Sequence, residues 1–400
     1  MRALLIATLL LAASGPAQAD EDKARKLHDR TLTVDSHIDL PRDWATSSLD
    51  VGALSAHQAD LVKMAAGGLK AAFFIAYTGQ KADTPQGLDE ARRESFGKLL
   101  AIHRMAHQHP DKVALAWRAE DAARITDQGR IAAFIGMENG FPIGQDLDWL
   151  RLAYEGGVRY VTLTHNGHNQ LGDSAQPKED LGDAEKRHGG LSAFGRAAVA
   201  EMNRLGILID ISHTAHKTTM EAVRLSKAPV IASHSSAKAL ADVPRNLSDK
   251  AIKAIAKRGG VIHIVAFPSY LIKSSPAEEA ERDALYQRYQ ADELDRPTYE
   301  ALRDAVEQKY GPADIEDLID HIDHVVKLVG VDHVGISSDF GGGGGIVGWR
   351  DARDTPNVTA ALLARGYSPK QIGKIWGGNL LRALADAERV AARLQAEAKP

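Results

Sequence analysis

Residues 207–234 read ILIDISHTAHKTTMEAVRLSKAPVIASH and contain two short apolar runs separated by a helical pattern. The runs Ile207–Ser212 and Pro229–Ser233 are rich in β-branched residues and too short for typical helices, as expected of strands buried on both faces. Each run ends directly at a histidine, His213 or His234. A strand, a helix and a second strand in this order predict neighbouring parallel strands.

The same strand-then-helix pattern recurs along the whole chain. The segments between the apolar runs, such as Leu191–Leu205, have helical periodicity and end near glycine. Eight such units are the number found in a (β/α)8 barrel, so we expect a TIM-like α/β barrel. The expected strands are Thr31–Ser36, Ala71–Ala76, Ile131–Met137, Arg159–Thr164, Ile207–Ser212, Pro229–Ser233, Gly260–Ala266 and His333–Ser338.

One long interruption separates the seventh and eighth expected strands, from about Pro268 to Asp332. Its segment Ala277–Tyr310 is highly charged and predicts one or two solvent-exposed helices inserted into the barrel. No linker rich in proline and serine divides the chain, so residues 20–400 are expected to form a single domain. A doubly wound open sheet is the alternative, but no Gly-rich dinucleotide-binding fingerprint follows the first strand.

The composition is that of an ordinary globular protein. The chain has 400 residues, of which 44% are hydrophobic and 26% charged, and its formal net charge is −4 at pH 7. Binding to nucleic acid requires a basic surface, so this balance argues against a nucleic-acid partner. The chain contains no cysteine, which excludes disulfides, thiolate catalysis and thiolate metal ligands.

Residues 1–19 have the pattern of a secretory signal peptide. A basic start precedes an apolar run from Ala3 to Ala13, and the small-residue cleavage pattern AQA occupies residues 17–19. The apolar run is too short to span a bilayer stably, and no later apolar run reaches the length of about 18 residues that a transmembrane helix needs. We therefore expect cleavage after Ala19 and a periplasmic or secreted mature chain without a transmembrane span.

Polar residues suited to metal binding occur at the ends of most expected strands. The carboxyl ends of all strands of a (β/α)8 barrel meet at one mouth, so residues distant in sequence converge there. Four histidines and three carboxylates, without cysteine, form a set typical of a site that binds metal ions through nitrogen and oxygen. These residues are His37, Asp39, Glu138, His165, His213, His234 and Asp339.

The positions of these residues indicate how they can divide between two metal ions. His37 and Asp39 alternate along an extended chain and so face the same side, where both can bind one ion. His213 and His234 come from neighbouring strands and can bind a second ion, while the two oxygens of Glu138 can bridge the ions. Metals roughly 3.5–4 Å apart hold a nucleophilic hydroxide and polarise the carbonyl group that it attacks.

His165 and Asp339 have no necessary contact with metal in this scheme and suit an oxyanion stabiliser and a proton shuttle. The complete set indicates a barrel of the amidohydrolase type. A single histidine at a strand end is more often structural, and the motif His-x-Asp alone is weak, so the inference depends on the joint pattern.

Other histidines and glycines are given structural interpretations. We expect His321 and His324 on the outer face of an amphipathic helix. The run Gly341–Gly345 lacks the ending of a phosphate-binding loop, so we expect a flexible loop beside Asp339.

At these positions the sequence closely resembles the membrane dipeptidase (renal dipeptidase-like) family of zinc peptidases. The resemblance implies two zinc ions per subunit, one bound by His37 and Asp39 and the other by His213 and His234, with Glu138 bridging them. The matching segments follow one another along nearly all of the mature chain and are VDSHIDLP, GMENG, YVTLTHNGHN, GLSAFGRAAVAEMNRLGILIDISH, PVIASHSSAKALADVPRN, HIDHVVKLVGVDHVGISSDF and GGNLL.

The resemblance also implies roles for three further residues. His165 would bind the substrate near the scissile carbonyl, and Arg245 would bind the C-terminal carboxylate of the substrate, for which a bidentate guanidinium is well suited. Asp339 corresponds to the acidic residue that transfers the proton. The usual family segment GSDFDG reads SSDFGGGGG here, so one acidic residue after Asp339 is missing. A homodimer is expected from the resemblance alone.

We therefore expect an exported zinc dipeptidase that hydrolyses free L-Xaa-L-Xaa and L-Xaa-D-Xaa dipeptides through a metal-bridging hydroxide. An amidohydrolase with the same site, acting on N-acyl amino acids or another small amide, is the alternative. A requirement for a free amine on the substrate would separate the two. A third possibility is a binding barrel with an inactive site, but every expected ligand is present in the sequence.

Overall fold

The computed structural model describes residues 16–41, 43–291 and 293–398. Eight parallel strands form a nearly closed barrel in the order β1-β2-β4-β5-β6-β7-β8-β9, which confirms the predicted fold. The first and last strands meet at a bridge between Ile38 and Phe340, where the backbone N–H of Asp39 donates to the carbonyl of Phe340 at 2.8 Å. The barrel strands are β1 (Val34–Asp39), β2 (Ala71–Ile75), β4 (Ile131–Met137), β5 (Val158–Thr162), β6 (Leu208–Asp210), β7 (Val230–Ser235), β8 (Val261–Val265) and β9 (Val334–Ser337).

Two strands continue past the ends that the sequence indicated. β1 was expected to stop at Ser36 but reaches Asp39, which pairs with Ile75 of β2. β7 likewise extends beyond Ser233 to Ser235. Polar residues in these positions do not end the strand, because the backbone can go on pairing while their buried side chains interact with one another. A short additional strand, β3 (Val113–Leu115), pairs with β4 and was not predicted.

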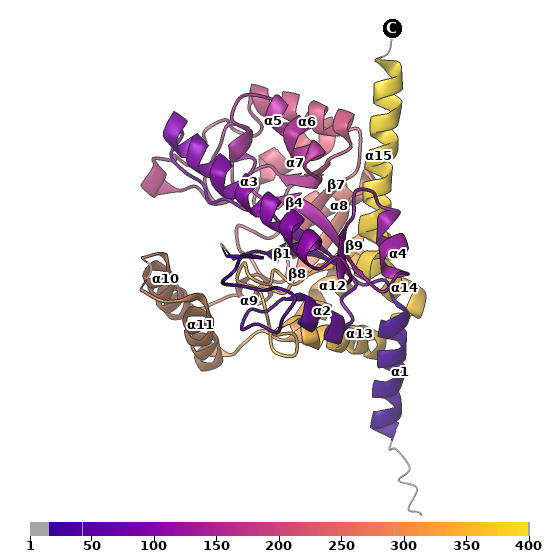
Figure 1. The fold of residues 1–400 in the computed structure, drawn as a ribbon. Coiled ribbons are helices and arrows are strands. Elements are labelled where there is room, and N and C mark those ends of the chain that lie inside the picture. The colour runs from indigo at the N-terminus through magenta and orange to yellow at the C-terminus, as the bar shows by residue number, and fades with distance from the viewer. Residues whose placement is uncertain (1–15, 42, 292, 399–400) are drawn as a thin grey trace, which may run out of the picture.

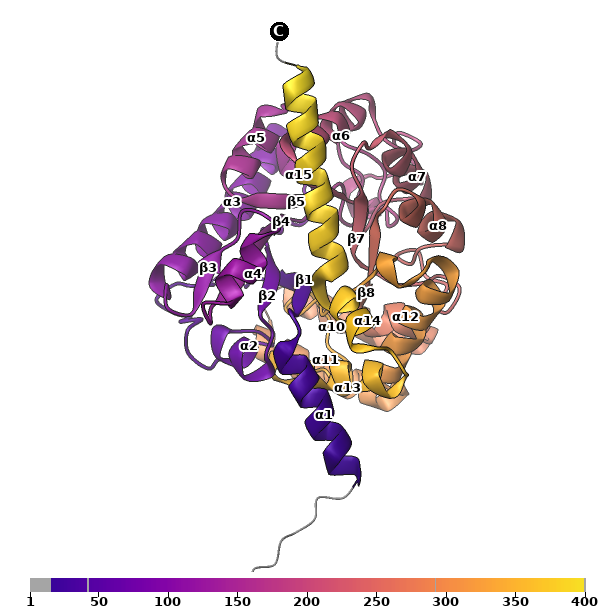
Figure 2. The ribbon, with the colours of Figure 1, turned by 90° about the vertical axis from the view of Figure 1, so that its right-hand side faces the viewer.

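Helices follow the strands and cover the outside of the barrel (Figures 1 and 2). Several begin at side-chain caps, as at Ser192 and Ser248, whose hydroxyls accept from the backbone N–H three residues ahead. The helices are α1 (Pro16–Arg30), α2 (Leu61–Gly67), α3 (Pro85–Gln108), α4 (Asp121–Thr126), α5 (Asp148–Glu155), α6 (Ala193–Leu205), α7 (His216–Leu225), α8 (Asp249–Lys257), α9 (Pro268–Leu271), α10 (Pro276–Gln290), α11 (Arg296–Tyr310), α12 (Ile315–Val329), α13 (Thr355–Ala364), α14 (Pro369–Gly373) and α15 (Asn379–Glu397).

The predicted helical insertion lies between β8 and β9, the seventh and eighth strands of the barrel. α10 and α11 pack side by side and project from the end of the barrel at which the strands have their carboxyl ends (Figure 1). Their ends are joined by Glu281, which accepts from the Tyr310 hydroxyl at 2.8 Å and forms an ion pair with Lys309. The insertion is therefore an ordered helical pair beside the mouth of the barrel.

The opposite end of the barrel is covered by α15, which crosses the front of the view in Figure 2. Its apolar side packs against residues at the beginning of the barrel strands, including Val34, Leu208 and Val261. The contributing residues of α15 are Leu380, Ala383, Leu384 and Ala387. Burial of this apolar surface fixes the amino ends of the strands, so the carboxyl ends remain available for the site.

The predicted signal peptide lies mostly in residues 1–15, outside the described residues. The described chain begins with α1, whose Ala24 and His28 are buried in contact with the rest of the fold. Among the described helices, none combines the length and apolar character needed to cross a membrane.

His321 is buried, which differs from its expected position on the outer face of α12. Only 1% of His321 is exposed, and the ring lies between two backbone groups. Its Nδ1 accepts from the N–H of Ala237 at 3.0 Å, and its Nε2 donates to the carbonyl of Leu271 at 3.0 Å. Burial lowers the pKa of His321 from 6.5 to about 4, so the folded protein holds it neutral.

The first prediction concerns the pH dependence of folding. Because the pKa of His321 is about 4 in the folded chain and 6.5 in the unfolded chain, its stabilising contribution is complete above pH 6.5 and is lost as the pH falls towards 4. The loss amounts to roughly 3 kcal/mol. We expect His321→Gln to lack this part of the acid destabilisation in urea titrations at pH 4 to 7.

The matched control is Val326→Ala, five residues further along α12, because it changes no titratable group. This variant should keep the pH dependence of the wild type. Equal pH dependence of the unfolding free energy in the wild type and His321→Gln would contradict the assignment.

Candidate metal centre and active site

The barrel brings all seven of the predicted strand-end residues into one buried cluster. His37 and Asp39 belong to β1 and His234 to β7, while the other four lie in the loops immediately after β4, β5, β6 and β9. Their ligand atoms form three overlapping groups in which all atoms lie within 4.8 Å of one another. These groups are His37, Glu138 and His234; Glu138, His165 and His213; and His37, Asp39 and Asp339.

Glu138 lies at the centre of the cluster, with each carboxylate oxygen facing different histidines. Its Oε2 lies 3.5 Å from Nε2 of His37, and its Oε1 lies 3.2 Å from Nε2 of both His213 and His234. Glu138 Oε1 and His37 Nε2 are buried without a hydrogen-bond partner. Buried polar atoms are rarely left unpaired, so their convergence fits the binding of metal ions between them.

Asp39 and Asp339 complete the side of the cluster nearest His37. Oδ2 of Asp39 lies 3.3 Å from Nε2 of His37, whereas Oδ1 of Asp339 is farther away, at 3.9 Å. Asp39 is therefore the better placed of the two to share an ion with His37. Asp339 lies at the edge of the same group.

Hydrogen bonds on the far side of the rings fix the tautomers of His37 and His213. Nδ1 of His37 lies 2.9 Å from the Tyr160 hydroxyl, which itself donates to the carbonyl of Ser36 at 3.0 Å. Nδ1 of His213 lies 2.9 Å from the amide oxygen of Asn166, which can only accept. Both rings therefore carry a proton on Nδ1 and direct Nε2, the atom that would bind metal, into the cluster.

Tyr160 and Asn166 were not identified from the sequence. Tyr160 lies in the middle of β5 and begins the matching segment YVTLTHNGHN, but nothing in that segment marks it as a partner of a histidine on β1. Asn166 directly follows His165 and could have been suspected, because amides commonly orient histidine ligands.

Burial keeps two of the histidines beside Glu138, His213 and His234, neutral. It lowers the pKa of His213 well below 6.5 and that of His234 to about 4, and in both cases it outweighs the attraction of Glu138. Burial alone would raise the pKa of Glu138, but the facing His37, His213 and His234 hold it well below its usual value. His37 differs, because burial would lower its pKa but Glu138 and Asp39 raise it well above 6.5. A divalent cation bound at its Nε2 would take the place of that proton.

The pKa of Asp339 is shifted in the opposite direction to that of Glu138. Burial raises its pKa well above the usual value, the neighbouring Asp39 and Glu138 add to this effect, and His37 opposes it. A carboxyl group that accepts a proton readily can act as a proton carrier.

The backbone φ of Asp339 is 55°, and that of His213 is 64°, in the left-handed region that residues other than glycine seldom adopt. Backbone strain of this kind commonly accompanies functional sites.

His165 and Arg245 lie next to the cluster. The His165 ring packs between His213, with centroids 4.1 Å apart, and Tyr77, at 4.9 Å. Arg245 lies in the loop after β7 and folds back, so that it donates to the carbonyl of His234 at 3.1 Å. Tyr270 faces its guanidinium at 5.2 Å.

The guanidinium of Arg245 has no countercharge among the residues that the structure describes. It is 3% exposed, its Nε is unpaired, and no described carboxylate lies within ion-pair distance. A buried cation without an anion is unfavourable, so the site is suited to receive a negatively charged group.

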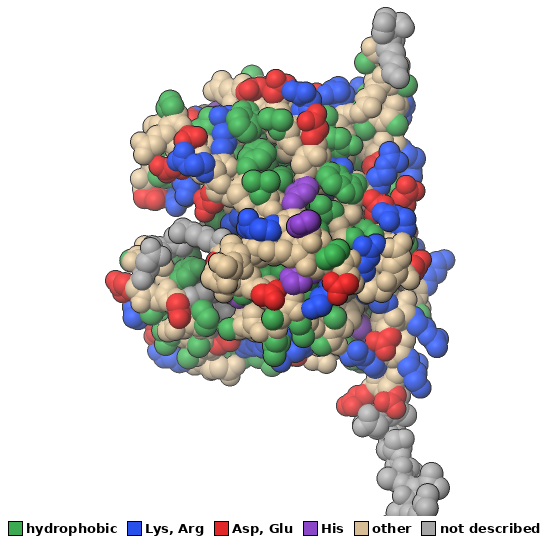
Figure 3. Space-filling model, viewed as in Figure 1, with side chains coloured by type: hydrophobic (Ala, Val, Ile, Leu, Met, Phe, Trp, Pro, Cys, Tyr) green, Lys and Arg blue, Asp and Glu red, His purple; other side chains and the backbone are tan. Residues whose placement is uncertain are grey.

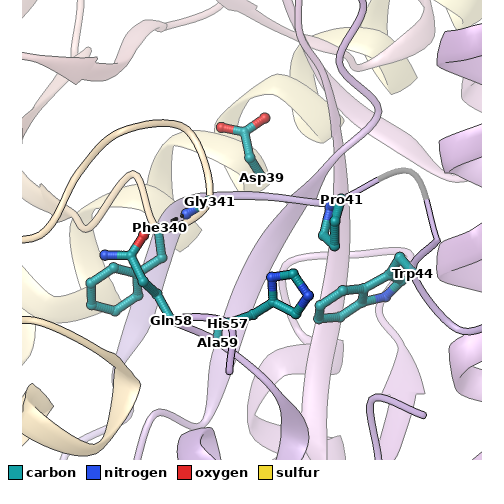
Figure 4. Close-up of a pocket in the computed structure, with 8 residues that line it drawn as sticks. All are labelled: Asp39, Pro41, Trp44, His57, Gln58, Ala59, Phe340 and Gly341. Carbon is teal, nitrogen blue, oxygen red and sulfur yellow. Dashed lines mark hydrogen bonds between the residues drawn. The ribbon is translucent and has the colours of Figure 1, made fainter. Parts of the chain in front are cut away.

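The five-glycine segment after Asp339 is tightly packed, whereas the sequence indicated a flexible loop. Gln58 accepts from the N–H of Gly341 at 3.1 Å and donates to the carbonyl of Gly344 at 2.8 Å. The buried Arg303 of α11 donates to the carbonyl of Gly343 at 2.9 Å. Figure 4 shows Gln58 beside Gly341 in a small cavity next to Asp39. The loop is thus bound to the barrel on one side and to the insertion on the other.

Gly342 explains why a side chain is absent from the middle of this loop. A Cβ atom at this position would lie 2.4 Å from Oδ1 of Asp339 and 2.4 Å from Oδ2 of Asp39. The backbone therefore packs directly against both carboxylates and limits where they can point.

On the surface, the face viewed in Figure 3 is hollowed at its edge, between the helical insertion and the part of the molecule above it.

A (β/α)8 barrel with histidines around a buried carboxylate at its mouth defines a metal-dependent hydrolase. The sequence profile of the family described as "Membrane dipeptidase (Peptidase family M19)" matches residues 21–398. The chain belongs to this family and is a metallodipeptidase, as its sequence resemblance indicated.

Individual relatives agree with this assignment. The dipeptidase aclJ of Aspergillus oryzae is 33% identical over 342 residues, which cover 84% of this chain and 72% of that protein. The crystal structure of the probable dipeptidase PvdM from Pseudomonas aeruginosa is 36% identical, with a TM-score of 0.85 and coverage of 94% of this chain and 100% of that one. An amidohydrolase from Pseudomonas aeruginosa is 25% identical, with a TM-score of 0.68 and coverage of 91% and 98%.

The second prediction tests the glycine loop. Gly342→Ala places a methyl group against both carboxylates, so Asp39 or Asp339 must move. Displacements of about 1 Å in a catalytic group cost on the order of 10²-fold in activity. We expect a loss of about that size in kcat/KM for a dipeptide, with a melting temperature close to that of the wild type.

Gly97→Ala is the matched control, because a Cβ at this position of α3 meets nothing within 4 Å. It should leave kcat/KM unchanged and should not lower the melting temperature. Wild-type activity in Gly342→Ala would show that the loop does not constrain the carboxylates.

Proposed function

We propose that this metallodipeptidase is an exported enzyme that holds two zinc ions and hydrolyses free L-Xaa-L-Xaa and L-Xaa-D-Xaa dipeptides. The observation that carries the proposal is the position of Glu138 between His37 on one side and the pair His213 and His234 on the other. A carboxylate with its two oxygens directed at separate sets of ligands is suited to bridging two ions.

The proposed ligands divide into two sets. His37 and Asp39 would hold one ion, His213 and His234 the other, and Glu138 would contact both. Nitrogen and oxygen ligands without thiolate are compatible with zinc. When bound, two such ions would supply an activated water molecule and polarise the scissile carbonyl.

The protein's own residues would position the dipeptide and move its protons. Arg245 would pair with the C-terminal carboxylate, which provides the anion that its buried guanidinium lacks. His165, in its neutral form, would donate a hydrogen bond to the carbonyl oxygen as negative charge develops there. Asp339 would accept the proton released by the attacking water and deliver it to the nitrogen of the leaving amino acid. The raised pKa of Asp339 supports this role.

The stereochemical part of the proposal rests on the family resemblance, which implies that either hand is accepted at the C-terminal residue. Dipeptides with a D-residue, such as those released during peptidoglycan turnover, are therefore proposed substrates. A homodimer also rests on the resemblance.

Export rests on the pattern of residues 1–19. Cleavage after Ala19 would leave the buried contacts that α1 makes through Ala24 and His28 intact. A periplasmic or secreted location is therefore compatible with the fold of the remaining chain.

An amidohydrolase of N-acyl amino acids is the second candidate, and it would use the same residues. It is favoured by the likeness to an amidohydrolase structure. Since Arg245 would bind a carboxylate in either case, the presence or absence of a free amine on the substrate separates the two candidates.

The third prediction is the outcome of a substrate panel. Zinc-loaded protein is incubated with L-L dipeptides, L-D dipeptides and the same compounds after N-acetylation, and amino acid release is measured. We expect cleavage of both free dipeptide sets, none of the acetylated compounds, and loss of activity in chelated controls. Cleavage of the acetylated compounds in preference to the free ones would replace the dipeptidase proposal by the amidohydrolase alternative.

The fourth prediction concerns Arg245. Arg245→Ala should raise KM for a dipeptide about 100-fold, a change of about 2.7 kcal/mol, because the charged pair with the substrate carboxylate is lost. Arg245→Lys should recover only part of the affinity, since an ammonium group cannot bind both carboxylate oxygens side by side. Zinc content by elemental analysis should match the wild type, and an unchanged KM with full zinc content would exclude the role.

A further inference from the structure

A further buried carboxylate lies behind the cluster, at the end of β6, and has no role in the scheme above. Asp210 is fully buried and has no ion-pair partner among the described residues. Its Oδ1 accepts from the N–H and hydroxyl of Ser212, at 3.0 and 2.9 Å, and from the N–H of Ser233 at 2.8 Å. Its Oδ2 accepts from the hydroxyls of Thr162 and Ser233, both at 2.6 Å. Five donors therefore converge on one carboxylate.

These hydrogen bonds determine the direction of the next one. A carboxylate only accepts, so the hydroxyl proton of Ser233 points to Asp210. The oxygen of Ser233 is then free to accept, and Nδ1 of His234 lies 2.8 Å away from it. His234 must carry its proton on Nδ1, which leaves Nε2 without a proton between Glu138 Oε1, 3.2 Å away, and His213 Nε2, 2.9 Å away. Acceptor atoms brought together in this way suit a shared cation.

We propose that Asp210 is a positioning residue for the metal centre, which acts through the Ser233 hydroxyl to fix the tautomer and orientation of His234. This inference rests on the proposed function, in which His234 and His213 hold one of two zinc ions. His37 and His213 are oriented by a phenol and an amide, whereas His234 is oriented by a hydroxyl that is itself bound to a carboxylate. Such support makes the imidazole a better ligand.

The substitution Asp210→Asn provides a specific test because it reverses one hydrogen bond while keeping the shape of the side chain. Two of the donors to Oδ1 are the backbone N–H groups of Ser212 and Ser233, which cannot turn into acceptors. The amide oxygen must therefore take the place of Oδ1, and the NH2 group must take the place of Oδ2. The NH2 group then donates to the Ser233 oxygen, and the hydroxyl proton turns towards Nδ1 of His234. This favours the tautomer with a proton on Nε2, which cannot bind metal.

The experiment measures zinc binding to the metal-free full chain by competitive titration with a chromogenic chelator. For Asp210→Asn and for Ser233→Ala, we expect one of the two zinc ions to bind 10- to 100-fold more weakly and the other to keep its wild-type affinity. The visible spectrum of the cobalt-loaded protein should change for the same single site.

Thr162→Val is the matched control, because it removes a donor at the same oxygen of Asp210 without touching His234. It should keep both zinc affinities and the cobalt spectrum, even if its melting temperature falls as far as that of Asp210→Asn. If Asp210→Asn does not fold, Ser233→Ala gives the same readout.

The possible outcomes distinguish this inference from the proposed function. Wild-type affinity at both sites in Asp210→Asn and Ser233→Ala, or equal weakening in Thr162→Val, would overturn the role of Asp210 while leaving the two-zinc centre intact. Binding of fewer than two zinc ions by the wild type would instead overturn the proposed function, and the inference would fail with it.

Discussion

The position of the Glu138 carboxylate is the constraint on which the rest of the site depends. A fully buried negative charge is costly unless it is compensated, and here the compensating groups come from β1, from the loop after β6 and from β7, which are not all neighbours in the barrel. The distances of 3.2–3.5 Å from the carboxylate to three imidazoles can be held only if the strands keep their register and the rings keep their orientation. The barrel supplies the register, and Tyr160, Asn166 and Ser233 supply the orientation.

The helical insertion contributes to the site through the glycine loop. Arg303 of α11 contacts the loop carbonyl at Gly343 and pairs at 3.5 Å with the buried Glu307, which also pairs at 3.3 Å with Arg350 beyond the loop. Burial raises the pKa of Glu307, although the neighbouring Arg303, Arg282 and Arg350 oppose this effect. Through these contacts, a segment that begins some sixty residues before β9 in the chain helps to place the backbone that packs against Asp39 and Asp339. The family segment GSDFDG has an acidic residue after the phenylalanine, and the corresponding segment here, SSDFGGGGG, has glycines instead. At Gly342 the backbone lies so close to Asp39 and Asp339 that there is no room for a side chain.

Much of the fold and the cluster could be predicted from the sequence, because a parallel barrel converts the ends of its strands into one surface. His37, Glu138 and Asp339 needed only their places at strand ends to be brought together. Arg245 could not be derived in this way, since it reaches the site by the folding back of a loop and was indicated by family resemblance alone. Asp210 and Tyr160 lie within apolar runs and resemble ordinary strand residues until their cross-strand partners are known. His321 was misplaced because helical periodicity cannot show that the loop after β7 and helix α9 cover the ring and each offer it one backbone partner.

The location of α1 and α15 has a practical consequence. Both helices lie on the side of the barrel remote from the insertion and the mouth, and the described chain enters through one and leaves through the other (Figures 1 and 2). A fusion partner, an affinity tag or a covalent link to a bead placed at either helix would be separated from the entrance by the body of the barrel. Molecules immobilised through either helix would then have the mouth of the barrel facing the solution.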